Sequence, residues 1–331
     1  MKVLRLHAIG DLRLHDEPLP TLKEGEELVR LKAVGICGSD VHWFSEAGIG
    51  DAQLDRPLVL GHEFAGVTES GESVAVDPAI PSGECEFCKH GHPNLCEQII
   101  FAGHGAQDGA LREWLAWPKR LLFPIPESLT AADGAMLEPL GVAIHAVDLG
   151  KLQAGMTVGV FGCGPIGLLT VQLARLSGAS NIIATDVLPH RVEAAKSLGA
   201  HNALLTGSKH DVSQMQAATG GRGVDVAFEV AGEQDAVNDA FAAVVPGGKV
   251  ILTGIPSNDE TSFTASVARR KGLTIKLVRR MKHTYPRAIE LVSKGLVDVR
   301  SLVTHRFSIE HAVETFEVAQ RREGLKIIIE V

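Results

Sequence analysis

Two groups of cysteine, histidine and acidic residues in the first half of the chain have the chemistry of metal ligands. Cys37 lies in the run GICGSDVHW, and His62 and Glu63 lie in GHEFAG. Thiolate and imidazole are zinc ligands, and a catalytic zinc keeps three protein ligands and one open position. Glu138 is a further acid at the start of an apolar stretch, where it would also be a favourable charge at a helix N-terminus. Taken singly, each of these residues is as compatible with ordinary packing as with metal binding.

The second group is a cysteine cluster with the spacing Cys85-x2-Cys88-x7-Cys96. Three thiols so close together are difficult to explain as packing, and five cysteines in 331 residues make a poor disulfide framework. The cluster therefore favours a metal site in a reducing compartment. A tetrahedral structural zinc needs a fourth ligand, and the nearby candidates are Ser82, Glu84, His90 and His92.

A glycine-rich turn in the middle of the chain has the pattern of a dinucleotide site. It follows a predicted strand over 158–161, it matches G-x-G-x-x-G, and its residues include Gly162, Gly164, Pro165, Ile166 and Gly167. Such a turn lets the backbone approach a pyrophosphate, and the following helix N-terminus supplies free N–H groups. Asp186 ends the next predicted strand, where its carboxylate can accept hydrogen bonds from the adenosine ribose. The same carboxylate would repel a 2′-phosphate, so the sequence favours NAD over NADP, although Arg191 could reach a phosphate or stack on adenine.

Composition argues against several other functions. The net charge is −8, from 40 acidic and 32 basic residues, and aromatic residues make up 5% of the chain. We therefore expect no nucleic-acid partner, because such binding needs a basic face or stacking platforms. The N-terminus carries charges every few residues, so we expect no secretory signal. The uncharged stretch 152–174 holds five glycines and a proline, and it predicts a strand, a turn and a buried helix rather than a membrane segment.

The elements expected to position these residues follow two patterns. Up to about residue 130, short apolar runs such as 3–6 and 28–34 are separated by Pro and Gly, which predicts an irregular all-β region. From 157 onward, strands alternate with helices, which predicts a parallel, doubly wound sheet. The predicted strands are 158–161, 181–186, 224–232, 249–254 and 274–278, and the predicted helices are 166–177, 190–199 and 236–245.

Beyond residue 280, two helices and a final strand are expected. One helix is predicted over 285–294, and Ser308 can cap the other. The final run LKIIIEV predicts a strand that returns to the first domain. The apolar face of the capped helix is expected to consist of Ile309, Val313, Phe316 and Ala319.

Together these motifs resemble the zinc-dependent medium-chain dehydrogenase/reductase superfamily over essentially the whole chain. GICGSD, GHEFAG, the cysteine cluster and GCGPIG with Asp186 carry the resemblance, and LEPLGVAIHA and LVTHRFSIEHAVETFE are most similar to the sorbitol (polyol) dehydrogenases. The resemblance implies an α/β plus β fold. A GroES-like zinc domain would span 1–138 and 281–331, and a Rossmann NAD-binding domain would span 139–280. It also implies a cytoplasmic homodimer or homotetramer that pairs through 274–278.

The resemblance also implies roles for single residues. Polyol dehydrogenases have a glutamate where many alcohol dehydrogenases have the third catalytic-zinc ligand, and Glu138 falls at that position, beside Cys37 and His62. Glu63 would hold a zinc-bound water or exchange in as a ligand. Ser39 would start a proton relay toward His42. The remaining expectations are substrate contacts from Ser39, Trp43, Trp114 and Arg279, and cofactor contacts from Ala231, Gly254, Val278 and Arg279.

The chain departs from the family pattern at two places. The family's structural lobe has four cysteines, and here the first position is Ser82, a poor zinc ligand. This lobe would therefore bind zinc weakly, use another ligand or stay empty. The connection VTESGES between Gly66 and Val74 is shorter than the family's by about a dozen residues.

The expected activity is zinc-dependent, NAD-linked and reversible oxidation of a secondary alcohol of a polyol, such as sorbitol, xylitol or galactitol, to a ketose. Hydride leaves a carbinol carbon only when its oxygen is nearly an alkoxide, and zinc makes this possible at neutral pH. The alternatives within the superfamily are a sugar-acid (idonate-like) or a threonine-like dehydrogenase. Zinc-free quinone or enoyl reductases would lack the ligands seen here. The alternative from another class is a nonenzymatic NAD- or zinc-binding protein, which needs no open zinc position.

Overall fold

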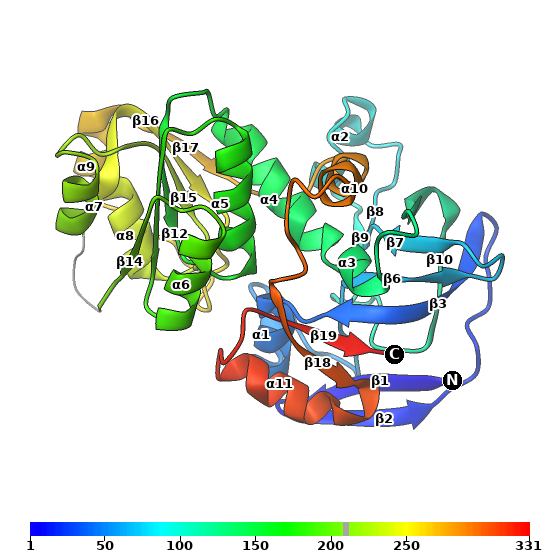
Figure 1. The fold of residues 1–331 in the computed structure, drawn as a ribbon. Coiled ribbons are helices and arrows are strands. Elements are labelled where there is room, and N and C mark those ends of the chain that lie inside the picture. Colours follow the sequence, from blue (N-terminus) through cyan, green and yellow to red (C-terminus); the bar gives the residue numbers. More distant parts are fainter. Residues whose placement is uncertain (208–211) are drawn as a thin grey trace. The chain divides into compact units, whose positions relative to one another are not determined.

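A computed structural model describes residues 1–207 and 212–331, which divide into two compact units (Figure 1). Unit 1 comprises Met1–Gly141 and Lys282–Val331, and unit 2 comprises Val142–Met281. The first division falls within the helix α4 (Leu137–Gly150). The metal-ligand candidates therefore all belong to unit 1, and the glycine-rich turn belongs to unit 2.

A seven-stranded sheet forms the centre of unit 1. Its strands are β3 (Glu26–Gly35), β6 (Glu63–Thr68), β7 (Ser73–Val76), β10 (Trp114–Pro118), β11 (Leu122–Pro124), β18 (Val303–Ser308) and β19 (Lys326–Glu330). The long strand β3 pairs with β6 along one edge, and with β10 and β19 along different stretches of the other. The C-terminal strand β19 thus returns to the first domain, as its apolar sequence predicts.

Short hairpins and helices surround this sheet. The hairpins are β1 (Lys2–Ala8) with β2 (Asp11–Asp16), β4 (Gly48–Ile49) with β5 (Ala52–Gln53), and β8 (Ala79–Ile80) with β9 (Ile100–Phe101). The helices are α1 (Gly38–Glu46), α2 (Glu86–Lys89), α3 (Ala131–Ala135), α10 (Tyr285–Ser293) and α11 (Ala312–Gln320), with 3₁₀ turns η1 (Pro93–Leu95), η2 (Lys119–Leu121) and η3 (Ile309–His311). The helix α1 differs from the all-β expectation for this region.

The helices α1 and α11 pack against each other in the core of unit 1. The ring centroids of Phe44 and Phe316 lie 5.0 Å apart, and both side chains are buried. The prediction that Val313 lies on the buried face of α11 is wrong, because 42% of this residue is exposed. The 3₁₀ turn η3 precedes the helix and changes its rotation, so that the buried residues are Ala312, Thr315, Phe316 and Val318.

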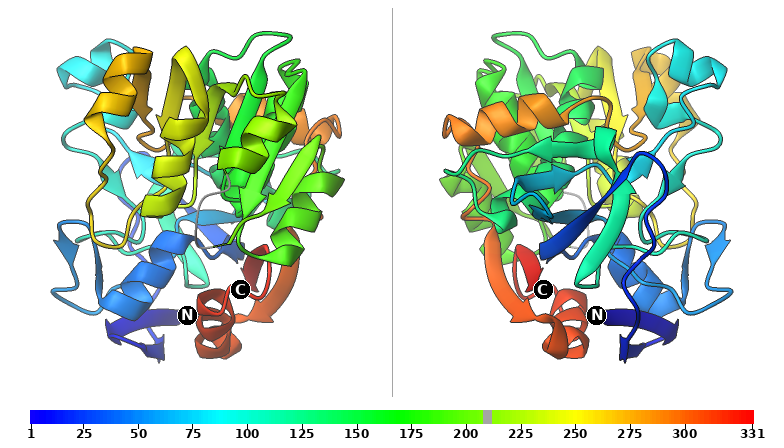
Figure 2. Two further views of the ribbon diagram at one scale, coloured as in Figure 1. Left: turned by 90° about the vertical axis from the view of Figure 1, so that its left-hand side faces the viewer. Right: turned by 90° about the vertical axis from the view of Figure 1, so that its right-hand side faces the viewer.

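Unit 2 contains the predicted doubly wound sheet, with helices packed along it (Figure 2). Its six parallel strands lie in the order β14-β13-β12-β15-β16-β17, and the order reverses between β12 and β15. Ligands of such sheets bind beyond the carboxyl ends of the strands at this reversal. The strands are β12 (Thr157–Phe161), β13 (Asn181–Asp186), β14 (Asn202–Leu205), β15 (Val224–Glu229), β16 (Val244–Leu252) and β17 (Thr274–Leu277).

The helices of unit 2 agree in part with the sequence-based prediction. They are α5 (Pro165–Leu176), α6 (Pro189–Ser197), α7 (Val212–Ala218), α8 (Gln234–Ala243) and α9 (Ala265–Lys271). The pattern did not predict α7, α9 or β14. It also extended α8 to residue 245, whereas β16 begins at Val244 with two successive β-branched residues.

The uncharged stretch 152–174 forms the strand β12, the glycine turn and most of α5. Within 1–207 and 212–331, we find no helix with the length and hydropathy needed to cross a bilayer.

Candidate active site

Cys37, His62 and Glu63 come together beside the end of β3. One ligand atom of each residue lies within 4.8 Å of those of the other two. Glu63 is the first residue of β6 and pairs with Gly35, the last residue of β3. Cys37 follows two residues later and begins α1. The pairing of β3 with β6 therefore brings the motifs GICGSD and GHEFAG into one place.

The close pairing of these strands depends on Gly35. A Cβ atom at this position would lie 2.2 Å from Oε2 of Glu63. No side chain tolerates such an approach, so a glycine is required for the Glu63 carboxylate to lie across the strand.

Lys326 of β19 contacts the same carboxylate, and both side chains are almost fully buried. Burial alone would lower the pKa of Lys326, but the negative charges of Glu63 and Cys37 outweigh it and raise that pKa. The ammonium therefore stays charged and balances part of the negative charge of the cluster. Sequence reasoning missed Lys326. A lysine directly before the apolar run of the final strand was a signal that its charge could be buried with a partner.

Asp40 connects the two ligand motifs through hydrogen bonds. Its carboxylate accepts the N–H of Cys37 at 2.9 Å and the N–H of Gly61 at 3.1 Å, and it lies 3.5 Å from Nδ1 of His62. Burial alone would raise the pKa of Asp40, but His62 and these donors hold it below its usual value. A carboxylate placed in this way fixes the ring orientation of a metal-binding histidine. Sequence reasoning missed Asp40. Its position three residues after Cys37, where a capping box places an acid, was a signal that could have found it.

Glu138 lies in the first turn of α4 and is buried, but it is not part of the three-residue cluster found among the described residues. Burial, reinforced by the charge of Glu63, raises the pKa of Glu138 to about 8. Glu63, which the resemblance also implied as a ligand, supplies the carboxylate of the cluster, and the ligand role of Glu138 stays a prediction. The β3–β6 register fixes Glu63 in place, whereas Glu138 reaches the neighbourhood from a different element.

The residues expected to move a proton lie on α1. Ser39 and His42 are three residues apart on this helix, a spacing that places them on the same face. Nδ1 of His42 lies 3.1 Å from a carboxylate oxygen of Glu46, and His42 remains partly exposed. Ser39 is partly exposed as well.

The two tryptophans expected to contact the substrate lie in different surroundings within unit 1. Trp43 is 2% exposed and belongs to the core of unit 1. Trp114 pairs with Arg30 in β3, and the guanidinium lies 6.0 Å from its ring. Arg30 precedes the end of β3 by five residues, or roughly 17 Å at the rise of a strand. The substrate contact of Trp114 stays a prediction. Phe101, which sequence reasoning missed, has its ring 5.3 Å from that of His62.

The donor set of the cluster fits a zinc ion. Zinc takes thiolate, imidazole and carboxylate ligands at 2.0–2.3 Å, so that the ligand atoms of a tetrahedral site are about 3.3–3.8 Å apart. The separations in the cluster are within small side-chain movements of such an arrangement. Three protein ligands leave one position of a tetrahedron for another oxygen.

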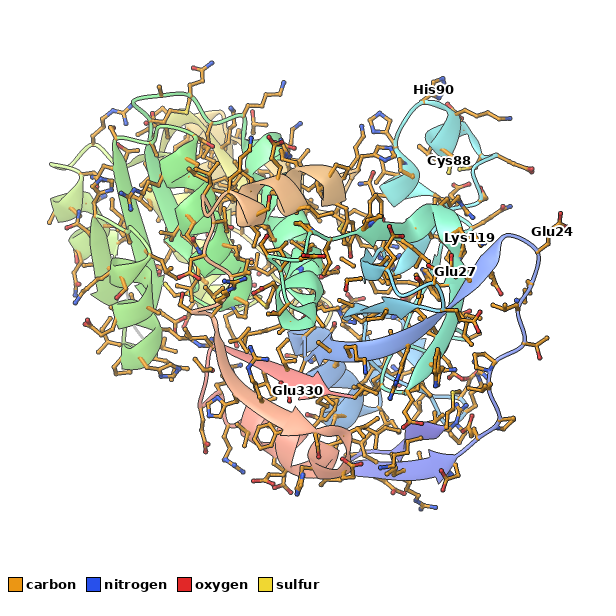
Figure 3. All side chains as sticks on the ribbon, turned by 45° about the vertical axis from the view of Figure 1, so that its right-hand side comes forward. Glu24, Glu27, Cys88, His90, Lys119 and Glu330 are labelled. Atoms are coloured by element: carbon orange, nitrogen blue, oxygen red, sulfur yellow. The ribbon has the colours of Figure 1, made fainter. Side chains whose placement is uncertain are left out.

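The cysteine lobe brings Ser82 to its three thiols (Cys88 is labelled in Figure 3). Oγ of Ser82 lies 3.4 Å from Sγ of Cys96 and 3.9 Å from Sγ of Cys88, and the Sγ atoms of Cys85 and Cys88 are 3.4 Å apart. Burial would raise the pKa of Cys96, but the hydroxyl and N–H of Ser82 outweigh it and lower that pKa to about 7. Ser82 therefore contacts two of the three thiols, while Nδ1 of His92 lies 2.9 Å from Nζ of Lys282.

We expect Ser82→Cys to tighten zinc binding at this lobe by at least about tenfold, because a fourth thiolate replaces a neutral hydroxyl. Zinc per chain, measured during competition with a chromophoric chelator, tests this expectation. Ser257→Cys, at an exposed serine of unit 2, is the matched control for adding a thiol. Equal zinc affinity in the Ser82→Cys variant and the wild type would contradict the expectation.

The glycine turn has the conformation that its sequence predicts. Gly162 has a φ of 103°, and a Cβ on Gly167 would lie 2.0 Å from the carbonyl oxygen of Gly162. Gly164 precedes α5, and Pro165 is its first residue, so the free N–H groups of this helix begin at the turn. Both glycines are thus required for the helix to start so close to β12.

Asp186 supports this turn from the end of β13. Its carboxylate accepts the N–H of Cys163 at 2.7 Å and that of Leu188 at 2.9 Å, and Arg191 lies 3.9 Å away. Cys163 is buried, and its thiol donates to the carbonyl of Thr185 at 3.4 Å, so it is a packed residue. Arg191 therefore accompanies Asp186 at this edge of the sheet.

The other expected cofactor residues follow neighbouring strands at the same carboxyl edge. Ala231 follows β15, Gly254 follows β16, and Val278 follows β17. Arg279 is next in the chain and is exposed. This edge is where doubly wound sheets hold their ligands.

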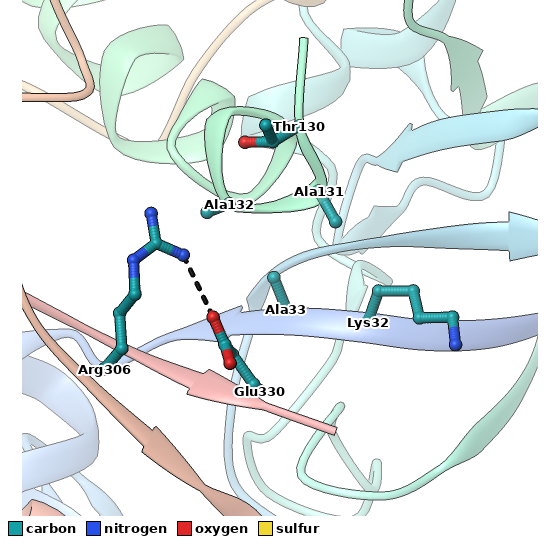
Figure 4. Close-up of a pocket in the computed structure, with 7 residues that line it drawn as sticks. All are labelled: Lys32, Ala33, Thr130, Ala131, Ala132, Arg306 and Glu330. Atoms are coloured by element: carbon teal, nitrogen blue, oxygen red, sulfur yellow. Dashed lines mark hydrogen bonds and ion pairs between the residues drawn. The ribbon is translucent and has the colours of Figure 1, made fainter. Parts of the chain in front are cut away.

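A separate pocket of about 280 Å³ lies in unit 1 (Figure 4). Arg306 and Glu330 form an ion pair of 3.1 Å within it, and Lys32 and Thr130 complete its polar lining. It contains none of the residues that the sequence analysis assigned to metal, cofactor or substrate.

Comparisons with known proteins match segments of both units. Residues 165–294 match the family model of the zinc-binding dehydrogenases, and residues 23–127 match that of the alcohol dehydrogenase GroES-like domain. The sorbitol dehydrogenase of Bacillus subtilis (strain 168) is 36% identical over 341 residues, which cover 99% of this chain and 97% of that protein.

Two solved structures are similar over their whole length. One is a short chain alcohol dehydrogenase from Escherichia coli CFT073 complexed with NADH, with a TM-score of 0.91, 29% identity and coverage of 100% and 99% of the two chains. The other is a candidate zinc-binding dehydrogenase from Sinorhizobium meliloti 1021 bound to NADP, with the same TM-score, identity and coverage. These two proteins hold different nicotinamide cofactors.

Proposed function

The chain belongs to the zinc-binding dehydrogenase family, and from this we propose that it oxidises a secondary alcohol of a polyol to a ketone, reversibly, with zinc and NAD. The observation that carries the proposal is the cluster of Cys37, His62 and Glu63. A polyol is the favoured substrate because the Bacillus subtilis relative is a sorbitol dehydrogenase.

Cys37, His62 and Glu63 would hold the zinc ion. A zinc ion at this position supplies a Lewis acid that makes a substrate hydroxyl acidic at neutral pH. Asp40 orients the ring of His62, and Lys326 limits the negative charge that the carboxylates and the thiolate bring together. Glu138 is a buried carboxyl that interacts with the charges of His62 and Glu63.

The proton of the substrate hydroxyl would pass to Ser39 and then toward His42. Both residues lie on one face of α1, and the contact of His42 with Glu46 orients the ring. Because His42 is partly exposed, the proton can continue to solvent. No step of this path needs a residue from unit 2.

The glycine turn of unit 2 would hold the pyrophosphate of NAD, whose nicotinamide accepts the hydride when bound. Asp186 would accept hydrogen bonds from the adenosine ribose, which favours NAD. The ion-pair distance between Arg191 and Asp186 supports this preference, because the guanidinium is already directed to a carboxylate.

A substrate screen tests the proposed function. The purified protein is assayed with alditols of four to six carbons, sugar acids and threonine, each with NAD and with NADP, and zinc is counted per chain. We expect turnover of at least one alditol with NAD and at least one zinc per chain. Turnover of sugar acids or threonine alone would assign the protein to another dehydrogenase of the family, and no turnover of any substrate would contradict an enzymatic role.

We also propose that two copies pair through β17. This strand is an edge of the parallel sheet, and 74% of Leu277 is exposed. An uncovered apolar edge strand favours association with another strand. Light scattering should give a dimer or a tetramer, and a monomer at micromolar concentration would contradict the pairing.

A further inference from the structure

One buried carboxylate of unit 2 has no role in the chemistry proposed above. Glu229 is the last residue of β15, at the carboxyl edge of the parallel sheet, and it is 1% exposed. Burial raises the pKa of this carboxyl despite three backbone N–H donors that act in the opposite direction. Acidic side chains are rarely buried unless their partners are supplied by the fold.

The contacts of Glu229 join the loops that follow two neighbouring strands. Oε1 accepts the N–H groups of Ala231 and Gly232, each at 2.8 Å, in the loop after β15. Its main-chain carbonyl accepts the N–H groups of Thr253 at 2.8 Å and Gly254 at 3.2 Å, in the loop after β16. One residue thus organises both loops.

These two loops touch each other so closely that their glycines cannot be replaced. A Cβ on Gly254 would lie 2.0 Å from the nitrogen of Gly232 and 2.8 Å from Oε2 of Glu229. A Cβ on Gly232, whose φ is 73°, would lie 2.4 Å from the carbonyl oxygen of Ile255. Because the loops are in direct contact, a shift in one must displace the other.

The same loops adjoin the glycine turn. A Cβ on Gly162 would lie 3.0 Å from Cβ of Ala231, so Ala231 packs directly against the first glycine of the motif. Residues 232–234, 256–258, 260 and 262 also line a pocket of about 420 Å³. The carboxylate of Glu229 therefore holds a loop that both lines this pocket and packs against the glycine turn, where the pyrophosphate is expected.

We propose that Glu229 is a positioning residue for the nicotinamide cofactor, which holds Ala231 and Gly254 in place beside the glycine turn. The inference rests on the proposed function, because it requires that unit 2 binds a nicotinamide dinucleotide. Glu229 acts through the backbone of these two loops. Its loss should therefore weaken cofactor binding and leave the metal cluster of unit 1 unchanged.

The test compares Glu229→Ala and Glu229→Gln with the wild type as zinc-loaded protein. We expect the Kd for NADH, measured by fluorescence titration, and the KM for NAD to rise about tenfold in Glu229→Ala, as for the loss of one or two charge-assisted hydrogen bonds. The value of kcat at saturating NAD should change less than about threefold. Glu229→Gln should be intermediate, because its amide oxygen can still accept from Ala231 and Gly232 while its NH₂ group faces the N–H of Gly254.

Asp225→Asn is the matched control. Asp225 lies on the same strand near its other end, where it accepts the N–H of Thr157 at 2.8 Å and pairs with Arg222 at 2.6 Å. This variant should lower the melting temperature and leave the Kd for NADH unchanged. A merely structural role of Glu229 would make the Glu229 and Asp225 variants behave alike.

The outcomes separate this inference from the proposed function. If the wild type binds NADH and both Glu229 variants bind it equally well, the inference is wrong and the proposed function stands. The inference is also wrong if Asp225→Asn weakens NADH binding as much as Glu229→Ala. If the wild type binds neither NADH nor NADPH, the proposed function fails, and the inference fails with it.

Discussion

Cys37→Ala should reduce kcat by at least about a thousandfold and remove one zinc per chain. Only His62 and Glu63 of the cluster would then remain, and two protein ligands do not hold a catalytic zinc. Without that Lewis acid, no group described around the cluster makes an alcohol acidic at neutral pH. Binding of NADH should be unchanged, because the glycine turn belongs to the other unit.

Cys163→Ala is the matched control for removing a thiol. Cys163 is buried in unit 2, and burial raises the pKa of its thiol far above the neutral range. Its variant should keep full zinc content and nearly full kcat. The measurements are metal content, kcat and the Kd for NADH. Turnover of zinc-stripped wild type at the normal rate would exclude metal-assisted chemistry altogether.

The second large effect is expected at Asp186. Asp186→Ala should lower kcat/KM with NAD by about a hundredfold. This is the effect expected when the adenosine ribose loses two hydrogen bonds to a charged acceptor. The same change releases Arg191 from its carboxylate partner at 3.9 Å, so the guanidinium becomes available to a 2′-phosphate. The ratio of kcat/KM with NADP to that with NAD should therefore rise at least about a hundredfold.

Two further variants separate the causes of this effect. Asp186→Asn loses the charge but keeps one acceptor oxygen, which can still accept the N–H of Cys163 in the glycine turn while its NH₂ group faces the N–H of Leu188. It should therefore show a smaller loss with NAD than Asp186→Ala. The double variant Asp186→Ala/Arg191→Ala should lose the gain with NADP. If NADP use rises equally in the single and the double variant, Arg191 is not the group that meets the phosphate.

The sequence predicted those parts of the protein that depend on local spacing. The strands and helices around the glycine turn follow from alternating apolar runs, and the parallel, doubly wound sheet agrees with the prediction. The helix α1 was missed because it is only nine residues long and begins with glycine and serine. Its start depends on the Asp40 carboxylate, which caps it at the N–H of Cys37.

The parts that could not be predicted depend on pairing between distant segments. The place of Glu63 beside Cys37 follows from the register of β3 with β6, which no local pattern contains. Lys326 reaches Glu63 only because the final strand returns to β3. Trp114 lies opposite Arg30 only because β10 pairs with β3. Each of these outcomes depends on which backbone segments lie side by side.

The contact between Lys326 and Glu63 joins the last strand of the chain to the metal cluster formed by its first half. A fragment that ends at Gly141 would keep Cys37, His62 and Glu63, yet its buried carboxylate would lack a counter-ion. During translation, Lys326 is added only after the whole of unit 2 has been synthesised. We therefore expect metal capture to be a late, post-translational event, and we expect a permuted gene that joins 282–331 directly to 1–141 to give the smallest autonomous metal-binding protein.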